Sequence, residues 1–234
     1  MELQEVLRQE KKYLLRIDAG ERLYYYLSRI LHEDSHNGAD GYSVRSLYFD
    51  TLQDTDYYEK MAGDFCRRKI RLRIYHPDDA FAKLEIKQKE GVYQKKRSLT
   101  VSRVDADKLI RGQYEVLLSY KDDFAAECYG MMKTRGYMPK CVVEYRRKAF
   151  VGLENNTRIT FDSQIRASET NYDIFDPQLL TYPVLQVWET ILEVKYNQFM
   201  LSYIKNAVDK CDKSEISMSK YIMARRVTKR EAMI

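Results

Sequence analysis

The chain has 234 residues, with 40 Lys and Arg against 35 Asp and Glu, and 44% of its residues are hydrophobic. This composition is typical of a folded globule with a sizeable core, and it excludes an intrinsically disordered chain. The net charge of +5 is too small for a histone-like positive coat. Any strong positive field must therefore come from the local arrangement of charges.

Signals for export or membrane insertion are not apparent in the sequence. The N-terminus is charged from Glu2 onward and lacks the apolar core of a secretion signal, and no apolar run approaches the length of a transmembrane segment. The four cysteines are widely scattered and form no Cys-x-x-Cys pair. We therefore expect a protein of the reducing cytoplasm.

The apolar pattern predicts strands and helices within a single domain that spans residues 1–234. Period-two alternation and β-branched or aromatic content predict strands at Val6–Leu15, Gly41–Phe49, Cys66–Tyr75, Phe81–Lys89, Val92–Val101, Cys141–Val151, Arg158–Phe161 and Val187–Tyr196. Helical spacing predicts helices at Ala19–Leu31, Asp54–Met61, Asp105–Leu118, Asp122–Arg135, Met200–Val208 and Glu215–Arg226. The stretch Ser163–Pro183 is expected to be a long excursion. Mostly antiparallel strands with helices inserted between them make an α+β fold.

Three of the expected strands carry an unusual polar face. Charged and aliphatic residues alternate strictly in Lys69–Tyr75, Lys83–Lys87 and Ile191–Lys195. Each strand therefore has one apolar and one polar face, and Lys and Arg dominate the polar one. Such a face suggests a surface that binds polyanions.

The amphipathic helices need an apolar sheet face to cover, and the cations lie together on the other face. A sheet that curls with its polar face inward satisfies both conditions. We therefore expect a closed eight-stranded antiparallel β-barrel with helices packed outside. Two like charges about 8 Å apart repel by roughly 2 kcal/mol at an effective dielectric of about 20. Hydration or neutral lysines would relieve this repulsion, but a bound anion does so best. A nucleoside triphosphate or a chain of phosphates is slender enough.

Other kinds of site find little support. The three histidines lack metal-ligand spacing, and neither common Gly-rich phosphate loop occurs. The cations alternate with aliphatic residues rather than with exposed aromatic ones, which makes nucleic acid an unlikely partner. The basic residues near the C-terminus indicate a solvated helix, or else contact with an acidic membrane surface.

The order and spacing of several short motifs resemble one known family. These motifs are Glu10-Lys11-Lys12-Tyr13, Arg45-Ser46-Leu47-Tyr48-Phe49-Asp50-Thr51, Lys69-Ile70-Arg71-Leu72-Arg73, Leu84-Glu85-Ile86-Lys87, Lys95-Lys96-Arg97, Tyr145-Arg146-Arg147-Lys148-Ala149-Phe150, Arg158-Ile159-Thr160-Phe161-Asp162, Leu192-Glu193-Val194-Lys195 and Ser219-Lys220-Tyr221. Together they resemble the polyphosphate polymerase (VTC) domain family of the CYTH-like triphosphate tunnel metalloenzymes. The resemblance implies an eight-stranded tunnel and transfer of the ATP γ-phosphate to polyphosphate with Mn²⁺ or Mg²⁺.

The resemblance also implies roles for individual residues. Catalytic cations would be Lys12, Arg71, Arg73, Lys87, Arg147 and Arg158. Further substrate-binding residues would be Lys69, Lys95, Arg97, Lys195 and Lys220. Glu193 would hold the metal, with Glu10 and Glu85 as additional candidates. In the doublets, strand alternation favours Arg147 over Arg146 and Lys95 over Lys96.

Three functions remain open from the sequence. The first is a metal-dependent phosphotransferase that elongates polyphosphate from ATP. The second is a triphosphatase that hydrolyses inorganic triphosphate or nucleoside triphosphates, because the same tunnel could admit water as acceptor. The third is a non-catalytic polyphosphate-binding module. An acceptor phosphate is largely ionised near neutral pH, so none of the three requires a dedicated general base.

Overall fold

A computed structural model of the chain describes residues 8–91, 93–217 and 219–231. Val6 and Val92, where two of the expected strands begin, lie outside these residues. The strands are β1 (Arg8–Arg16), β2 (His32–Glu33), β3 (Tyr42–Thr51), β4 (Cys66–Ile74), β5 (Phe81–Glu90), β6 (Tyr93–Ser102), β7 (Tyr137–Val151), β8 (Arg158–Ser168), β9 (Tyr182–Pro183), β10 (Glu189–Asn197) and β11 (Lys213–Glu215). The helices are α1 (Ile17–Leu27), α2 (Thr55–Ala62), α3 (Arg103–Ile110), the 3₁₀ helix η1 (Tyr114–Ser119), α4 (Asp123–Thr134), α5 (Ser202–Asp209) and α6 (Lys220–Glu231). Among these helices, none is long and apolar enough to cross a membrane.

The expected mixed α+β fold with a large antiparallel sheet is confirmed, but the expected closed eight-stranded barrel is wrong. Within the described residues the sheet has eleven strands. Nine of them follow the order β11-β1-β10-β8-β7-β3-β4-β5-β6, while β2 pairs with β7 and β9 with β8. The path has two ends, at β11 and β6, and is not closed. Local alternation predicts which side chains share a face, but closure depends on pairing between distant edge strands.

The chain divides into two compact units, which are described separately. Unit 1 comprises residues 1–43, 145–165 and 185–218, and unit 2 comprises residues 44–144, 166–184 and 219–234. The strands β3, β7 and β8 each contribute residues to both units. The expectation that residues 1–234 form a single domain is not tested by this division and stays a prediction.

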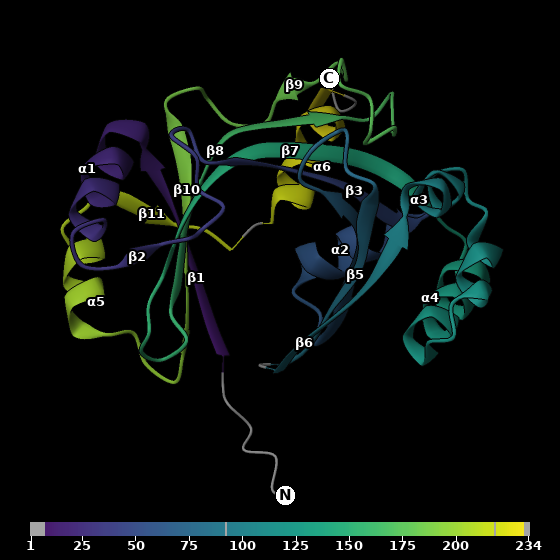
Figure 1. The fold of residues 1–234 in the computed structure, drawn as a ribbon, viewed down its shortest axis with the longest axis horizontal. Coiled ribbons are helices and arrows are strands. Elements are labelled where there is room, and N and C mark those ends of the chain that lie inside the picture. The colour runs from purple at the N-terminus through teal and green to yellow at the C-terminus, as the bar shows by residue number, and fades with distance from the viewer. Residues whose placement is uncertain (1–7, 92, 218, 232–234) are drawn as a thin grey trace, which may run out of the picture. The chain divides into compact units, whose positions relative to one another are not determined.

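In unit 1, helices α1 and α5 pack together against one face of β1 and β10 (Figure 1). The apolar residues of alternate strand positions, among them Leu15 and Leu192, are buried there with Leu23 of α1. Gly20 permits the close approach of α1, since a Cβ atom at this position would lie 2.8 Å from Cγ2 of Thr190. The other face of these strands is left to the charged residues.

In unit 2, helices α3 and α4 cover one face of β5 and β6 (Figure 1). The covered face consists of the aliphatic residues of the alternating strands, including Leu72, Leu84 and Ile86, and all three are almost completely buried. Burying one such side chain contributes roughly 1.5–3 kcal/mol. The period-two pattern therefore places the cations of these strands on the opposite face.

Two of the expected helices differ from the structure. The continuous helix expected over Asp105–Leu118 is interrupted, because Gly112 adopts a left-handed conformation (φ +77°) that ends α3, and η1 follows. The terminal helix begins at Lys220 rather than Glu215. Glu215 instead belongs to β11, which pairs with β1 at Tyr13.

The excursion expected at Ser163–Pro183 begins with the second half of β8 and continues as loop. A buried arginine of β3 holds this loop within unit 2: Arg45 donates to the backbone oxygens of Ile174 (3.0 Å) and Asp176 (2.6 Å). Its Nη2 also lies 2.8 Å from Oε2 of Glu144. These contacts satisfy the guanidinium inside the protein, so Arg45 has a structural role.

Two buried aspartates join β3 to α2. Asp50 accepts hydrogen bonds from the backbone N–H groups of Asp56 and Tyr57 (both 2.9 Å) and from the hydroxyl of Tyr221 (2.7 Å). Asp56 accepts a hydrogen bond from the hydroxyl of Tyr137 (2.9 Å). Burial, together with the nearby charge of Asp50, raises the pKa of Asp56 to about 7. Folding therefore favours the protonated form of this carboxyl.

This raised pKa predicts a pH-dependent stability. Because the pKa of Asp56 in the folded state lies above its usual value of 3.8, its contribution is fully present below about pH 4 and is lost as the pH rises through about 7. Asp56→Asn should remove this dependence and raise the free energy of unfolding at pH 8 relative to the wild type. Urea denaturation at pH 5 and pH 8 measures the effect. The exposed Asp64→Asn variant is the control, and an Asp56→Asn profile parallel to that of the wild type would contradict the assignment.

Candidate functional site

Strand pairing in unit 2 places the cations of β4, β5 and β6 in cross-strand rows on one face of the sheet. Six of these side chains are positively charged and one is negatively charged. The three central rows are Lys69–Lys87–Lys96, Arg71–Glu85–Ser98 and Arg73–Lys83–Thr100. We call this set the unit 2 polar face. Like charges directly opposite each other on neighbouring strands are destabilising, so negative charge close to this lysine row is stabilising.

Glu85 is the acidic centre of the unit 2 polar face. Its side chain is almost fully buried, and Nε of Arg71 lies 2.6 Å from its Oε2. Arg73 approaches the same oxygen at 3.8 Å, and Lys96 pairs with Oε1. Burial opposes ionisation, but these three cations outweigh it and lower the pKa of Glu85 to about 2. The carboxylate thus stays charged at neutral pH and holds the cations in place.

Strand β3 supplies neutral partners for the two arginines. Arg71 donates from Nη1 to the hydroxyl of Tyr48 (3.4 Å), and Arg73 donates from Nε to the hydroxyl of Ser46 (3.2 Å). The register pairs Tyr48 with Arg71 and Ser46 with Arg73. Neither residue was predicted to belong to the site from the sequence. In the sequence, Ser46 and Tyr48 alternate with the apolar residues Leu47 and Phe49. This alternation could have predicted that they lie on the polar face.

The expectation that Lys95 and Arg97 share the face of Arg71 is wrong. The register pairs Lys96 with Lys87, whereas Arg97 pairs with Ile86 on the helix-covered face. There Arg97 forms an ion pair with Glu127 of α4 and lies over the ring of Phe124, 4.8 Å from its centre. Lys96 therefore belongs to the unit 2 polar face. Alternation along the strand shows that Lys95 and Lys96 point to opposite faces of the sheet. It does not show which of these faces the helices cover.

Lys220, which was expected to bind substrate, is the first residue of α6 and is largely buried. Its neighbour Tyr221 stacks on Tyr48 with ring centroids 5.2 Å apart. The start of α6 therefore lies next to the β3 tyrosine that contacts Arg71.

In unit 1, the charged face of β1, β10 and β8 consists of two cross-strand rows. These rows are Glu10–Lys195–Arg158 and Lys12–Glu193–Thr160. Nζ of Lys12 lies 2.5 Å from Glu10 and 3.7 Å from Glu193, and Nζ of Lys195 lies 2.5 Å from Glu193 and 3.8 Å from Glu10. Two lysines and two glutamates therefore alternate around this cluster.

The two arginines of this face each have an aspartate partner. Arg147 binds Asp162 through two parallel hydrogen bonds, of 2.6 and 2.8 Å, and Asp162 is completely buried. Nη2 of Arg158 lies 2.6 Å from Asp34 and donates to the hydroxyl of Tyr42 (3.2 Å). Burial opposes ionisation of Asp34, but hydrogen bonds from His36 and Arg158 lower its pKa to about 2.

We call these two rows, together with Arg147 of β7, Asp162 and Asp34, the unit 1 polar face, and this face is balanced in charge. Its four cations, Lys12, Lys195, Arg147 and Arg158, are matched by four carboxylates, Glu10, Glu193, Asp162 and Asp34. The unit 2 polar face has one carboxylate for six cations. The two faces differ in this respect although both arise from the same alternating pattern.

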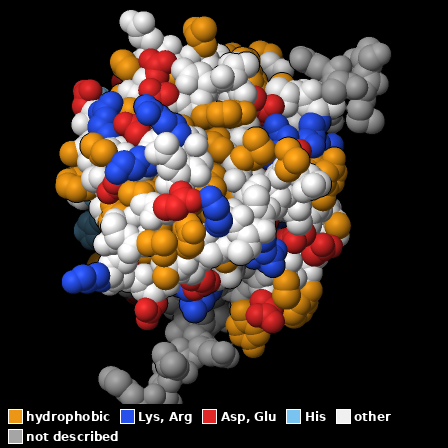
Figure 2. Space-filling view, turned by 90° about the vertical axis from the view of Figure 1, so that its right-hand side faces the viewer, with side chains coloured by type: hydrophobic (Ala, Val, Ile, Leu, Met, Phe, Trp, Pro, Cys, Tyr) orange, Lys and Arg blue, Asp and Glu red, His pale blue; other side chains and the backbone are white. Residues whose placement is uncertain are grey.

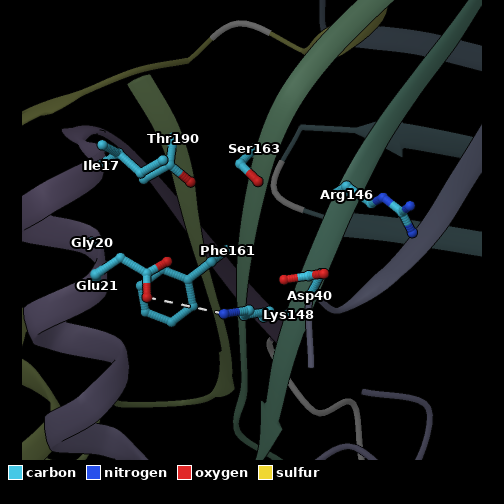
Figure 3. A pocket seen from close by; sticks show the side chains of 9 residues that line it. All are labelled: Ile17, Gly20, Glu21, Asp40, Arg146, Lys148, Phe161, Ser163 and Thr190. Atoms are coloured by element: carbon cyan, nitrogen blue, oxygen red, sulfur yellow. Dashed lines mark ion pairs between the residues drawn. The ribbon is translucent and has the colours of Figure 1, made fainter. Parts of the chain in front are cut away.

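Both doublets can now be assigned. The guanidinium of Arg147 lies over the ring of Tyr145, 5.2 Å from its centre, which confirms that these residues share a face. Arg146 lines a pocket of about 40 Å³ at the first turn of α1 (Figure 3). In that pocket Lys148 and Glu21 point toward each other across Phe161, 4.0 Å apart. This volume corresponds to about three water molecules.

The side of the molecule seen in the space-filling view carries mixed charge. Figure 2 shows Lys and Arg side chains scattered among Asp and Glu on the face turned to the viewer. Such a surface is typical of a solubilising exterior. It agrees with the inference that the mild net charge does not form a broad positive coat.

The described residues contain no group of three or more His, Cys, Asp or Glu side chains placed to hold a metal ion. Glu85 is a poor ligand for Mn²⁺ or Mg²⁺, because it is the one carboxylate of the three central rows and three cations surround it. Glu193 and Glu10 also contact cations, but there two carboxylates share two lysines. Glu193 and Glu10 suit a hard cation better. Their carboxylates lie together, and the buried hydroxyl of Thr160 next to Glu193 has no hydrogen-bond partner in this part of the chain. Mg²⁺ commonly takes one or two carboxylates together with substrate phosphates.

The contacts of Glu85 predict a measurable loss of stability. Glu85→Gln should lower the free energy of unfolding at pH 7 by about 3 kcal/mol, because it leaves cations without their buried partner. The pKa of Glu85 is lowered in the folded state, so its contribution is present above about pH 4.5 and fades as the pH falls toward 2. The difference between variant and wild type should therefore shrink at pH 3.

Urea denaturation at both pH values measures this difference. Glu127→Gln is the matched control, since it breaks the more exposed ion pair of Arg97. We expect it to cost less than about 1 kcal/mol. Equal losses in the two variants would contradict the central role of Glu85.

Comparison with known proteins relates this arrangement to a family. The model of the VTC domain matches residues 7–229. No curated protein matches the sequence significantly. Among solved structures, HpAC1 from Hippeastrum, whose description reports a dominant triphosphatase activity, has a TM-score of 0.55 and 14% identity, with 93% of this chain and 96% of that chain covered.

Two further structures are similar at lower scores. The bh2851 protein from Bacillus halodurans has a TM-score of 0.47 and 13% identity, with 87% of this chain and 88% of that chain covered. The PH1819 protein from Pyrococcus horikoshii OT3 has a TM-score of 0.44 and 10% identity, with 92% and 97% covered. The likeness to HpAC1 shows a shared fold, and the family model spans nearly the whole chain. The resemblance found in the sequence is thereby confirmed: the chain belongs to the VTC domain family.

Proposed function

We propose that the chain catalyses metal-dependent phosphoryl transfer from ATP to polyphosphate. The observation that carries this proposal is the row Lys69–Lys87–Lys96, which adjoins Arg71 and Arg73 on the unit 2 polar face. Two cations about 8 Å apart repel by roughly 2 kcal/mol at an effective dielectric of about 20. The three central rows hold six cations and one carboxylate, and this density of positive charge suits a ligand with several negative charges. Membership in the VTC domain family supports a triphosphate or polyphosphate ligand.

The unit 2 cations would bind phosphate oxygens in two ways. Arginine can bind two oxygens at once through its planar fork, whereas lysine acts as a point charge. Glu85, Tyr48 and Ser46 orient the guanidinium groups of Arg71 and Arg73 before any ligand arrives. Because the side chains are already held, less conformational entropy is lost on binding. Lys69 and Lys87 would add charge to the same ligand.

The unit 1 residues would serve the nucleotide and its metal. Glu193 and Glu10 would hold Mn²⁺ or Mg²⁺, which when bound neutralises charge on the phosphate oxygens. Arg147 already fills its fork with Asp162, so it would contribute positive charge rather than a bidentate contact. Arg158 would bind a phosphate oxygen while Asp34 positions it.

The residue types suit this chemistry. Phosphoryl transfer passes through a loose transition state, so positioning and charge stabilisation account for most of the catalysis. The acceptor is a phosphate that is largely ionised at neutral pH and needs no base. A face rich in Arg and Lys with few carboxylates therefore supplies what the reaction requires.

A second candidate is hydrolysis of triphosphate or nucleoside triphosphates. It is favoured by the fold shared with HpAC1, whose description reports a dominant triphosphatase activity. The same cations would stabilise the transferred phosphoryl group, and water would replace phosphate as the acceptor. A non-catalytic polyphosphate binder would need the cations alone.

The assignment of the Lys95-Lys96 doublet yields a binding test. At a hundredfold excess over its dissociation constant, tripolyphosphate should stabilise the wild type by about 2.7 kcal/mol. Lys96→Met should weaken this binding about tenfold, as expected when one charged contact is lost. Lys95→Met, one residue away and on the other face, should bind as the wild type does. Thermal unfolding with increasing tripolyphosphate measures both, and equal effects of the two variants would refute the proposed face.

The reaction itself can be read from its products. After incubation with ATP and Mn²⁺, a gel that resolves polyphosphate should show long chains. Free phosphate alone would identify a triphosphatase, and unchanged ATP would leave only binding. Glu193→Gln should abolish turnover while tripolyphosphate binding without metal changes little. Unimpaired turnover in this variant would exclude the metal role of Glu193.

A further inference from the structure

Thr160 lies at the centre of the unit 1 polar face and has an unusual environment. Its side chain is 3% exposed, and Oγ1 has no hydrogen-bond partner within the described part of the protein. A buried hydroxyl without a partner costs about 1–3 kcal/mol. A valine of the same shape would avoid this cost. The hydroxyl is therefore available to a partner that is not part of the polypeptide.

The strand register shows what lies next to this hydroxyl. Thr160 of β8 is directly opposite Glu193 of β10, and both side chains lie on the same face. The carboxylate of Glu193 is directed toward Lys12 and Lys195. The oxygen of Thr160 consequently lies beside a carboxylate to which it is not hydrogen-bonded.

This neighbour decides which ligand the hydroxyl fits. A phosphate oxygen at Thr160 would be repelled by Glu193 across the strand pair, and the two nearby lysines, Lys12 and Lys195, are already paired with Glu193 and Glu10. A divalent cation is attracted to both groups, because the carboxylate supplies charge and the hydroxyl supplies a neutral oxygen. Hard cations prefer oxygen ligands of these kinds.

We propose that Thr160 supplies a neutral oxygen ligand to the divalent cation held by Glu193. The inference rests on the proposed function, since that function brings a metal to Glu193. It gives the threonine a role in metal affinity rather than in the stability of the fold. In the absence of metal, Thr160→Val should leave the free energy of unfolding unchanged or raise it, because the variant removes an unpaired polar atom.

The chain offers a matched control. Thr157 is also buried, at 1% exposure, and its Oγ1 also lacks a hydrogen-bond partner among the described residues. It precedes β8 and packs against Gly152, whose N–H donates to the Thr157 backbone oxygen at 2.8 Å. Thr157→Val therefore makes the same chemical change in the same unit, away from Glu193.

Binding of Mn²⁺ alone, followed by the electron paramagnetic resonance signal of the free ion, tests the proposal. We expect Thr160→Val to weaken Mn²⁺ binding about tenfold, Thr160→Ser to retain it, and Thr157→Val to match the wild type. Glu193→Gln should weaken it at least as much as Thr160→Val. Urea denaturation without metal confirms that each variant is folded.

Each other outcome overturns the proposal in a recognisable way. Equal Mn²⁺ affinity of Thr160→Val and Thr157→Val would remove Thr160 from the metal site. Unchanged Mn²⁺ affinity with weakened binding of metal-free tripolyphosphate would assign the hydroxyl to phosphate instead. A wild type that binds neither Mn²⁺ nor tripolyphosphate would overturn the proposed function itself, whereas a wild type that binds both leaves only the Thr160 assignment in question.

Discussion

The ion pairs of Glu85 are the interaction on which the candidate site of unit 2 depends. Arg71, Arg73 and Lys96 would repel one another on neighbouring strands, and the buried carboxylate holds them together at neutral pH. Its lowered pKa reflects how far their attraction exceeds the cost of burial. The same contacts fix the direction of the guanidinium groups. The positive face is thus built before a ligand binds, and it keeps an excess of charge that a polyanion can neutralise.

The two units use the same alternating strands for different electrostatic tasks. In unit 1 every cation of the polar face that was assigned a role has a carboxylate partner, as Arg147 has Asp162. A face with equal numbers of positive and negative groups suits a metal cation bound together with its phosphate, because it favours neither a cation alone nor an anion alone. In unit 2 the three central rows hold six cations and one carboxylate, which suits a chain of phosphates.

Much of the site could be predicted from the sequence because period-two alternation is local. Arg71 and Arg73 face the same way whatever the rest of the sheet does, and Glu193 and Lys195 do so as well. The predictions failed where alternation is compatible with two assignments, or where the partner of a charged residue is distant in the sequence. Lys95 and Lys96 point to opposite faces of the sheet, and only the position of α4 shows which of these faces is covered by a helix.

The sequence by itself determined the strands, their two faces, the family and most of the charged residues that form the candidate site. Tertiary structure decided which charges meet. The partners Asp34 of Arg158 and Tyr48 of Arg71 come from other strands or loops, so no spacing along the chain encodes them. It also decided that the sheet has two ends, since pairing of edge strands depends on long-range packing and not on local pattern. The unpartnered hydroxyl of Thr160 became visible only when the opposite strand was in place.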